Sequence, residues 1–354
     1  MSGRIEDWER ARVYGPRIAV IGGGTGLSAM LRGLKRGSEN ITAIVAMSDD
    51  GGGSGVLRND LGMLPPGDVR NCILALAGAE PMMTKLMNYR FPEGRLTGQS
   101  FGNLFLAALV GIYGSFETAA KRMGELLAVT GQVLPVTTAD VRLEAEFEND
   151  ARVLGESRIA AAKKLQKCRI RRVRLVPGHP PALKDALTAI AEADLVVLGP
   201  GSLYTSVIPN LLVEGIADAV ASSGALRVYV CNVMTQEGES EGYTAFEHVR
   251  ALLSHSRADL LDVCLCNSAP ISEAMRAKYR EEGAGQTTID REAFASAGIE
   301  LREKALMEEQ NGVVRHCPPR LTYALLSLLR EKRPRAGLQG RLDDTMLHHL
   351  RFQL

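Results

Sequence analysis

The chain has 354 residues, of which 45% are hydrophobic and 23% are charged, as is usual for a globular protein that buries a large core. The formal net charge of +1 gives no field that would favour nucleic acid or an anionic membrane, and no apolar run reaches the roughly 18 residues that span a bilayer. Residues 1–16 are polar and lack the apolar core of a secretory signal, so we expect a cytoplasmic protein with reduced cysteines.

The first part of the chain reads as a strand, a helix and a second strand. Residues 17–21 form a short apolar run that enters the glycine turn Gly22-Gly23-Gly24-Thr25-Gly26, and a helical pattern of apolar residues follows. Residues 41–47 are apolar and rich in β-branched side chains, which predicts the second strand. It leads into Asp49-Asp50-Gly51-Gly52, a second glycine turn with two adjacent carboxylates. The spacing is that of a βαβ unit.

Helices are expected to dominate the segment that follows. Residues 64–68 contain proline and glycine and break the chain, and Asp68 is placed to cap a helix that runs through residue 77. Residues 100–129 have a helical period that is interrupted near Gly114. Residues 142–158 then alternate between apolar and polar around a central Asn-Asp pair, which predicts an antiparallel hairpin.

The second half repeats the pattern of a strand followed by a helix. Residues 195–198 are a buried strand that ends in the third glycine turn, residues 199–206, and a helix is expected after Pro209. Residues 228–231 and 263–266 are two further strands with only apolar residues. Continuous apolar runs are typical of parallel strands that are covered on both faces.

These elements predict an α/β fold, with a doubly wound, mostly parallel Rossmann-like sheet, helices on both faces and a small antiparallel hairpin insertion. We expect an N-terminal extension at residues 1–16, a single nucleotide-binding domain at residues 17–330 and a C-terminal tail at residues 331–354. Residues 331–341 are charged and rich in helix breakers, which predicts a mobile segment, and residues 343–354 could form a short docking helix.

Three glycine turns at one edge of a parallel sheet favour a nucleotide-like ligand. Each turn brings backbone N–H groups to a helix N-terminus, where they and the helix dipole stabilise phosphate. One alternative is a nicotinamide dinucleotide, with Gly24-x-Gly26-x-x-Ala29 as its fingerprint and Asp49 as the ribose acceptor. Against it, the glycines begin too early, the acid is doubled, and further glycine follows the acid. An oxidoreductase of this kind would also need a proton-transfer histidine or a Tyr–Lys pair, and none is visible.

Several polar residues near the turns have both a structural and a ligand-binding interpretation. Asp68 could cap a helix or face the ligand, and Asn103 at the start of an apolar helix has the same two possibilities. The third turn is dense in donors, which favours a site there. Its candidates are Gly201, Ser202, Tyr204, Thr205 and Asn210. No zinc spacing, nucleophile elbow or P-loop is present.

Four long motifs carry a resemblance to a known family. They are IGGGTGLSAMLRGLK (21–35), SDDGGGSGVLRNDLGMLPPGDVRNCILALA (48–77), GPGSLYTSVIPNLL (199–212) and YVCNVMTQEGESEGYTAFEH (229–248). Together they resemble the YvcK family of gluconeogenesis factors, in the larger group that includes the 2-phospho-L-lactate transferase CofD. The resemblance runs from about residue 17 to residue 330. One departure is Gly53-Ser54, where the family loop usually reads D-D-G-G-S-S-G.

The two branches of that group imply different functions. The YvcK branch implies binding of a UDP-sugar, such as UDP-N-acetylglucosamine, by a regulator of gluconeogenic growth and cell shape, with no established reaction. The CofD branch implies a magnesium-dependent transferase that moves a phospholactyl group from a guanosine diphosphate carrier to a deazaflavin. There Asp49 and Asp50 would face the metal and the acceptor, and Asp50 would be the metal ligand. Residues 232–236 and 199–212 resemble the YvcK branch, which makes regulation the first hypothesis.

In this hypothesis the diphosphate lies on residues 22–26 and 199–202, with Asp49 and Asp50 at the sugar or ribose. Tyr279 supplies a stacking face and Arg315 a phosphate contact, although packing and a surface ion pair are alternative roles for these two. The full set of candidate ligand-binding residues is Gly22, Gly23, Gly24, Thr25, Gly26, Leu27, Asp49, Asp50, Gly51, Gly52, Asp68, Asn71, Asn103, Gly201, Ser202, Tyr204, Thr205, Asn210, Tyr279 and Arg315. We expect no cofactor beyond Mg²⁺ in the transferase case, no nucleic acid, no membrane insertion, a homo-oligomer, and a protein partner that the sequence does not identify.

Overall fold

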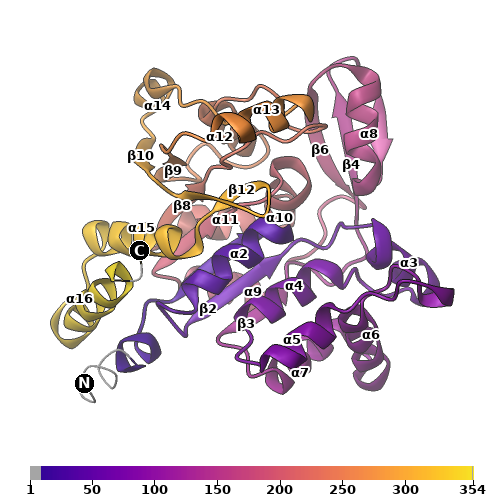
Figure 1. Ribbon diagram of the computed structural model, residues 1–354, viewed down its shortest axis with the longest axis horizontal. Coiled ribbons are helices and arrows are strands. Elements are labelled where there is room, and N and C mark those ends of the chain that lie inside the picture. The colour runs from indigo at the N-terminus through magenta and orange to yellow at the C-terminus, as the bar shows by residue number, and fades with distance from the viewer. Residues whose placement is uncertain (1–8, 353) are drawn as a thin grey trace.

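The computed structural model describes residues 9–352 and 354, and a seven-stranded parallel sheet forms its centre (Figure 1). Every neighbouring pair in this sheet is parallel, and the strand order is β10-β9-β8-β7-β1-β2-β3. The strands are β1 (Ile18–Gly22), β2 (Ile41–Val45), β3 (Gln132–Pro135), β7 (Leu195–Leu198), β8 (Leu226–Val230), β9 (Val263–Asn267) and β10 (Glu300–Lys304). The doubly wound α/β fold that the sequence predicts is confirmed.

The direction in which the sheet is built reverses between β1 and β7. The chain first adds β2 and β3 on one side of β1 and later adds β7 to β10 on the other side. Because βαβ crossovers are right-handed, this reversal places the helices of the two halves on opposite faces. The helices are α2 (Gly24–Leu34), α3 (Gly52–Leu61), α4 (Gly67–Leu76), α5 (Pro81–Asn88), α6 (Phe101–Tyr113), α7 (Phe116–Leu126), α8 (Glu156–Gln166), α9 (Lys184–Ala191), α10 (Ile208–Leu211), α11 (Ile216–Ser222), α12 (Ala245–Ser254), α13 (Glu273–Glu281), α14 (Arg291–Ala297), α15 (Pro318–Lys332) and α16 (Gly337–Arg351).

The core is built from the apolar strands and the helices packed on them. The strand segments IAVIG of β1 and LVVL of β7 are buried at every position, as a sheet covered on both faces requires. The helix α2 packs against α4 and α15. The helix α9 packs against α11. None of the described helices is by itself long and apolar enough to cross a membrane, although α6 and α7, bent by 120°, pass that test as a pair.

Two smaller antiparallel sheets stand outside the central one. The expected hairpin is confirmed as β4 (Arg142–Phe147) and β5 (Arg152–Leu154), and β6 (Ile170–Val176), which was not predicted, pairs with the other side of β4. The helix α8 connects β5 to β6. The second sheet is the hairpin of β11 (Met307–Gln310) and β12 (Val313–His316), which comes directly before α15.

The helix after residue 66 begins without the cap that the sequence predicts. Its N-cap is Pro66, which makes no side-chain cap hydrogen bond, and Asp68 lies inside the first turn. The Asp68 carboxylate instead accepts a hydrogen bond from the backbone N–H of Gly24, at 2.8 Å. The capping interpretation of Asp68 is therefore wrong, because the side chain reaches the first glycine turn.

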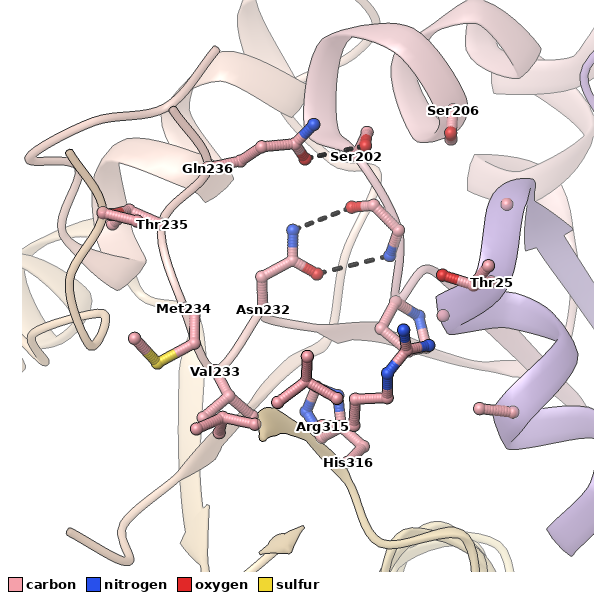
Figure 2. Close-up of a pocket in the computed structure, with 18 of the residues that line it drawn as sticks. Thr25, Ser202, Ser206, Asn232, Val233, Met234, Thr235, Gln236, Arg315 and His316 are labelled. Carbon is pink, nitrogen blue, oxygen red and sulfur yellow. Dashed lines mark hydrogen bonds between the residues drawn. The ribbon is translucent and has the colours of Figure 1, made fainter. Parts of the chain in front are cut away.

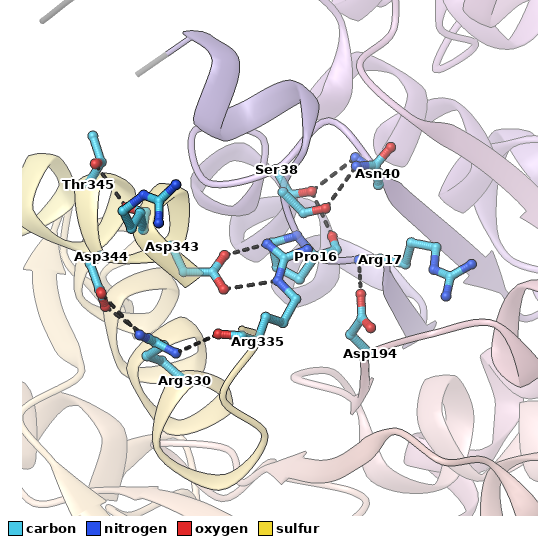
Figure 3. A network of polar contacts seen from close by, with 12 residues as sticks. Pro16, Arg17, Ser38, Asn40, Asp194, Arg330, Arg335, Asp343, Asp344 and Thr345 are labelled. Atoms are coloured by element: carbon cyan, nitrogen blue, oxygen red, sulfur yellow. Dashed lines mark hydrogen bonds and ion pairs between the residues drawn. The ribbon is translucent and has the colours of Figure 1, made fainter. Parts of the chain in front are cut away.

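The helix α16 confirms most of the docking helix expected at residues 343–354, and it also includes residues 337–341, which the sequence predicted to be mobile. The helix α16 buries Leu342, Met346 and Leu350. Figure 3 shows the polar contacts that fix it: Arg330 pairs with Asp344, and Arg335 pairs with Asp343. Of the expected N-terminal extension, residues 1–8 lie outside the described residues, whereas residues 9–13 are helical and bury Ala11.

Candidate functional site

The first and third glycine turns meet where the sheet reverses direction. The carboxyl ends of β1 and β7 are adjacent, with Ile21 paired to Leu198, so both turns leave the same edge of the sheet. The turns are too close for side chains: a Cβ on Gly26 would lie 2.9 Å from the carbonyl oxygen of Pro200. A crevice at such a reversal point is where open α/β sheets bind ligands.

A cavity of about 580 Å³ opens at this point (Figure 2). Its walls come from the first turn, the third turn, the loop after β8, the helix α13 and the hairpin strand β12. The lining residues are Gly23, Gly24, Thr25, Gly26, Ala29, Pro200, Gly201, Ser202, Ser206, Asn232, Val233, Met234, Thr235, Gln236, Glu237, Tyr279, Glu282, Ala284, Val313, Val314, Arg315 and His316. The cavity has the size of a site for a cofactor or nucleotide.

The N-terminus of α2 faces this cavity with its backbone donors exposed. The N-cap of α2 is Gly23, which has no side chain to cap the helix, and no acidic residue of α2 itself lies in its first turn. The N–H groups of the first turn of a helix have no partner within the helix, and the helix dipole makes this end attractive to anions. Of these groups, the N–H of Gly24 is bonded to Asp68, whereas Thr25 and Gly26 line the cavity.

The donors of the third turn, in contrast, are bonded to the protein itself. One carboxylate oxygen of Glu239 accepts from the backbone N–H groups of Tyr204 at 3.0 Å and Thr205 at 2.9 Å. The Asn232 amide accepts from the N–H of Gly201 at 3.3 Å and donates to its carbonyl at 2.8 Å, and the Ser202 hydroxyl donates to the Gln236 side chain (Figure 2). The third turn is therefore a wall of the cavity, with its anion-binding position filled by Glu239.

A cation without a partner points into the opposite side of the cavity. Arg315 lies on β12, paired with Glu308 of β11, and within the described part of the chain its guanidinium makes no hydrogen bond or ion pair. Burial, and then the charge of Arg315, lower the pKa of the Arg32 guanidinium, so the two cations repel each other. An anionic ligand would relieve that repulsion. No ion pair of Arg315 is present among the described residues, so the alternative role that the sequence left open for it is not supported.

The ring of Tyr279 is held in place beside this cation. Its hydroxyl oxygen accepts a hydrogen bond from the N–H of Val314 at 3.0 Å, which ties α13 to β12. The half-buried ring packs against the buried cluster of Val233, Ile271 and Val314 and lines the cavity. Tyr279 therefore packs within the protein and also lines the cavity. Its fixed ring offers a flat apolar surface to a ligand.

The paired acids of the second turn lie beside the cavity and do not line it. An oxygen of Asp49 accepts from the N–H of Gly51, and an oxygen of Asp50 accepts from the N–H of Ser157, each at 2.9 Å. Burial and the charges of Asp49 and Asp50 raise the pKa of the nearby Glu156 to about 7. Burial raises the pKa of Asp68 to about 6, and the charge of Asp49 adds to that rise. The described residues contain no acid, histidine or cysteine group arranged as metal ligands.

Other residues that the sequence proposed as ligand contacts lie in the core or make contacts within the protein. Asn210 is fully buried and its amide donates to the carbonyls of Gly22 and Ser206, which joins the first turn to the third. Leu27 is in the core. Gly52 opens α3, and Asn71 accepts from Arg70. Tyr204 is buried and its hydroxyl contacts that of Tyr243.

Asn103 is a separate case, because it is buried with one atom unpaired. The cap of α6 is Ser100, whose hydroxyl accepts from the N–H of Asn103, so Asn103 is not the cap. Its own side-chain carbonyl has no hydrogen-bond partner among the described residues. The ligand-contact interpretation of Asn103 stays a prediction.

Several residues of the site were not among the sequence candidates, and four of them are polar residues with a defined role. Asn232, Gln236 and Glu239 lie in the loop after β8, where they hold the third turn, and His316 lines the cavity with an unpartnered Nε2. Burial lowers the pKa of His316 to about 4, so this side chain is neutral. The signal for the first three was a polar loop directly after a buried parallel strand, as at the three glycine turns.

Comparisons with known proteins agree with this fold. A family model described as 2-phospho-L-lactate transferase CofD matches residues 18–307, which include all seven strands of the central sheet. The chain is 45% identical over 317 residues to the gluconeogenesis factor of Bacillus subtilis, covering 89% of this chain and 99% of that protein. It is 44% identical over 321 residues to the gluconeogenesis factor of Halalkalibacterium halodurans, covering 90% and 97%. A crystal structure of a Bacillus halodurans protein matches with a TM-score of 0.84 at 42% identity, covering 88% of this chain and 99% of that one.

Proposed function

We propose, since this chain belongs to the CofD family and to the gluconeogenesis factors within it, that it is a regulatory protein that binds a nucleoside diphosphate sugar. The ligand class that fits best is a UDP-sugar such as UDP-N-acetylglucosamine. In the cell it would report on central carbon metabolism to cell-shape and cell-wall control, in the cytoplasm, through a protein partner. Growth and cell shape of a deletion strain on gluconeogenic carbon sources test that cellular role.

One observation carries the ligand class: Thr25 and Gly26 of the first turn of α2, beside the Gly24 N–H that Asp68 accepts from, line the same cavity as the unpaired Arg315 side chain. Backbone N–H groups and a guanidinium are the donors that bind a diphosphate best. We therefore place the diphosphate at Thr25 and Gly26, with Arg315 as its counter-charge. The third turn, where the sequence also placed the diphosphate at residues 199–202, serves as a wall in this proposal. Asn232 already accepts from the N–H of Gly201, and Glu239 accepts from those of Tyr204 and Thr205.

The other walls suit the uncharged parts of the ligand. Tyr279 and the apolar side chains of Met234 and Val313 offer a surface for a base, whereas His316 and the amide of Asn232 offer neutral polar contacts. Asp49 and Asp50 lie outside the lining, so in this proposal they meet only the far end of the ligand, at its sugar.

Isothermal titration calorimetry of the whole chain tests the ligand class. UDP-N-acetylglucosamine should give a saturable heat with one site per chain, and GDP should give none or much less. Absence of heat with UDP-N-acetylglucosamine at millimolar concentration, together with saturable binding of GDP, would contradict the proposal. A nicotinamide dinucleotide arm in the same titration checks the oxidoreductase alternative.

The second candidate function is a Mg²⁺-dependent transferase with a nucleoside-diphosphate-linked donor. The observation that favours it is the concentration of negative charge beside the cavity, where Asp49 and Asp50 raise the pKa of Glu156, although these carboxylates are not arranged as a set of metal ligands. The same family name, 2-phospho-L-lactate transferase, supports it at a coarse level. This candidate predicts Mg²⁺-dependent product formation that Asp50→Asn abolishes, whereas a sensor gives binding and no product.

A further inference from the structure

A second cavity, of about 400 Å³, lies between α15 and the edge strand β10. Its walls come from β9, β10, the segment that follows β10 and one face of α15, together with Leu354. The described residues that line it are all different from those that line the cavity at the glycine turns. Its volume is within the usual range of small-molecule sites, about 300–1,000 Å³, and the chemistry of its walls indicates the kind of ligand.

One wall of this cavity is a face of α15. It carries Tyr323, Ala324 and Ser327, whose spacing of three and four residues places them on one side of the helix. The opposite side of α15 holds Leu325 and Leu329 in the core. Because Ala324 and Ser327 have small side chains, they leave room between α15 and the sheet.

The floor of the cavity is apolar. Leu265, Leu306 and Leu328 contribute to the lining and are otherwise buried in the core. The Ser327 hydroxyl is also buried, and it has no hydrogen-bond partner among the described residues. A buried polar atom without a partner costs free energy, which a ligand or a bound water that supplies the hydrogen bond removes. The floor therefore suits the apolar body of a ligand.

The charged part of the lining is mainly basic. Arg302, Lys304 and Arg320 face a single acid, Glu331, and Glu331 pairs with Arg302. Arg320 donates one hydrogen bond, to the carbonyl of Met307 at 3.1 Å, and pairs with no acid in the described part of the chain. The Lys304 side chain makes neither a hydrogen bond nor an ion pair with any described residue. Two exposed cations at the rim are therefore available to a ligand.

We propose that this cavity binds a small anion with an apolar body, such as a medium-chain carboxylate. Lys304 and Arg320 supply the charge for its head, because charge-assisted hydrogen bonds from ammonium and guanidinium groups to a carboxylate are strong. The leucine floor and the ring of Tyr323 bury its apolar body. A cationic ligand meets repulsion at this rim, and a neutral one gains nothing from it. The inference is independent of the ligand at the glycine turns.

Isothermal titration calorimetry of the whole chain with decanoate tests the ligand class. Decanoate should give a saturable heat with one site per chain. Acetate has the charge without the body, and decan-1-ol has the body without the charge, so each should bind at least about 10-fold more weakly. Decyltrimethylammonium has the same body and the opposite charge, and it should give no saturable heat.

Two substitutions locate the binding. Lys304→Glu replaces an attractive charge by a repulsive one and should weaken decanoate binding by about 10-fold to 100-fold. Ala324→Trp fills the cavity and should abolish decanoate binding. Lys304 is exposed, so Lys304→Glu should leave the unfolding midpoint unchanged even if Ala324→Trp lowers it. Lys121→Glu is the matched control, because Lys121 is an exposed lysine on α7, outside the cavity.

Absence of a saturable heat with decanoate would overturn the proposal, as would equal binding of decanoate and decyltrimethylammonium. Decanoate binding that Lys304→Glu and Ala324→Trp leave unchanged would overturn it as well, because the ligand would then lie elsewhere on the chain. A similar loss of affinity in Lys304→Glu and Lys121→Glu would show attraction by surface charge in general and would equally reject the cavity as the site.

Discussion

At the scale of single residues, the charges of the site differ between its two glycine turns. The turn at residues 22–26 has N–H groups open to an anion at Thr25 and Gly26, whereas the turn at residues 199–206 is closed by the Glu239 carboxylate. Glu239 is 2% exposed, and one of its oxygens accepts from two backbone N–H groups while the other has no partner among the described residues. Burial raises its pKa from the ordinary 4.5 to about 7, against the lowering effect of those N–H groups. The carboxylate thus occupies, at a cost in desolvation, the position that a phosphate takes at an open turn.

This raised pKa predicts that Glu239 makes stability depend on pH. Below pH 4.5 the carboxyl is protonated in both the folded and the unfolded chain. Between pH 4.5 and 7 the unfolded chain releases the proton and the folded chain keeps it, so the free energy of unfolding falls as the pH rises, by about 3 kcal/mol in total. Glu239→Gln keeps the acceptor oxygen and should remove that part of the slope in urea unfolding.

The comparison variant for this measurement is Glu214→Gln, because Glu214 is exposed at the surface and its substitution should leave the slope unchanged. Asp68 and Glu156 also have raised pKa values and add slopes of the same sign, so the difference between unmodified chain and variant is the quantity to compare. Equal slopes in the unmodified chain and Glu239→Gln would show that Glu239 is not held neutral.

Arg315 is the residue whose loss should weaken ligand binding most selectively. It has no partner in the described chain, so Arg315→Ala breaks no internal contact and should leave the unfolding midpoint unchanged. A charge-assisted contact of this kind contributes about 1.5–3 kcal/mol, which corresponds to roughly 10-fold to 100-fold weaker binding of the UDP-sugar. Arg142→Ala, an exposed arginine outside the cavity, is the control in the same calorimetry. Unchanged affinity in Arg315→Ala would remove Arg315 from the site.

At the scale of helices and strands, the predictable elements are those whose own sequence requires them. The strands β1, β7 and β9 are buried at every position, and their apolar runs predict them directly. In contrast, β10 (ELREK) carries four charged residues at the edge of the sheet, where charges are normal on an edge strand and hide it from an apolar-pattern search. The strand β6 was missed in the same way, because three of its seven residues are arginine.

Only the second part of α16 was predicted, as a docking helix, because the glycines in its first part read as helix breakers. Gly337 begins the helix at φ +62°, which suits glycine, and a Cβ on Gly340 would lie 2.3 Å from the carbonyl oxygen of Arg335. Both glycines therefore permit a tight connection, and burial against α15 stabilises the helix. The roles of Glu239 and Asn232 could not be predicted from the sequence either. Both side chains bond to the backbone of the third glycine turn, which is more than 30 residues away in the chain.

The burial of α16 predicts a measurable contribution to stability. Met346 is 2% exposed, and Met346→Ala should lower the free energy of unfolding by about 2–5 kcal/mol through lost packing and the cavity that remains. Leu338→Ala, in the same helix but at a 62% exposed position, should have little effect. Urea unfolding compares the two variants. Similar small effects of both would mean that α16 does not dock on the folded chain.

At the scale of the whole molecule, the cavity exists because two halves of the chain meet at the reversal of the sheet. Thr25 comes from the first half, Ser202 and Asn232 come from the second, and Arg315 comes from the hairpin before α15. Residues nearly 300 positions apart thus face one ligand. The sequence predicted the glycine turns and their position at a common edge of the sheet. Only the structure shows which turn has free backbone donors and which has its donors occupied by the protein.

The central claim is that a diphosphate lies at the N-terminus of α2 and not at the third turn. A crystal structure of the chain with UDP-N-acetylglucosamine tests it most directly. The account predicts both phosphorus atoms beside the backbone N–H groups of Thr25 and Gly26, with Arg315 in contact and Glu239 still bonded to Tyr204 and Thr205. A diphosphate bound at residues 199–202 with Glu239 displaced, or held at Asp49 and Asp50, would contradict it.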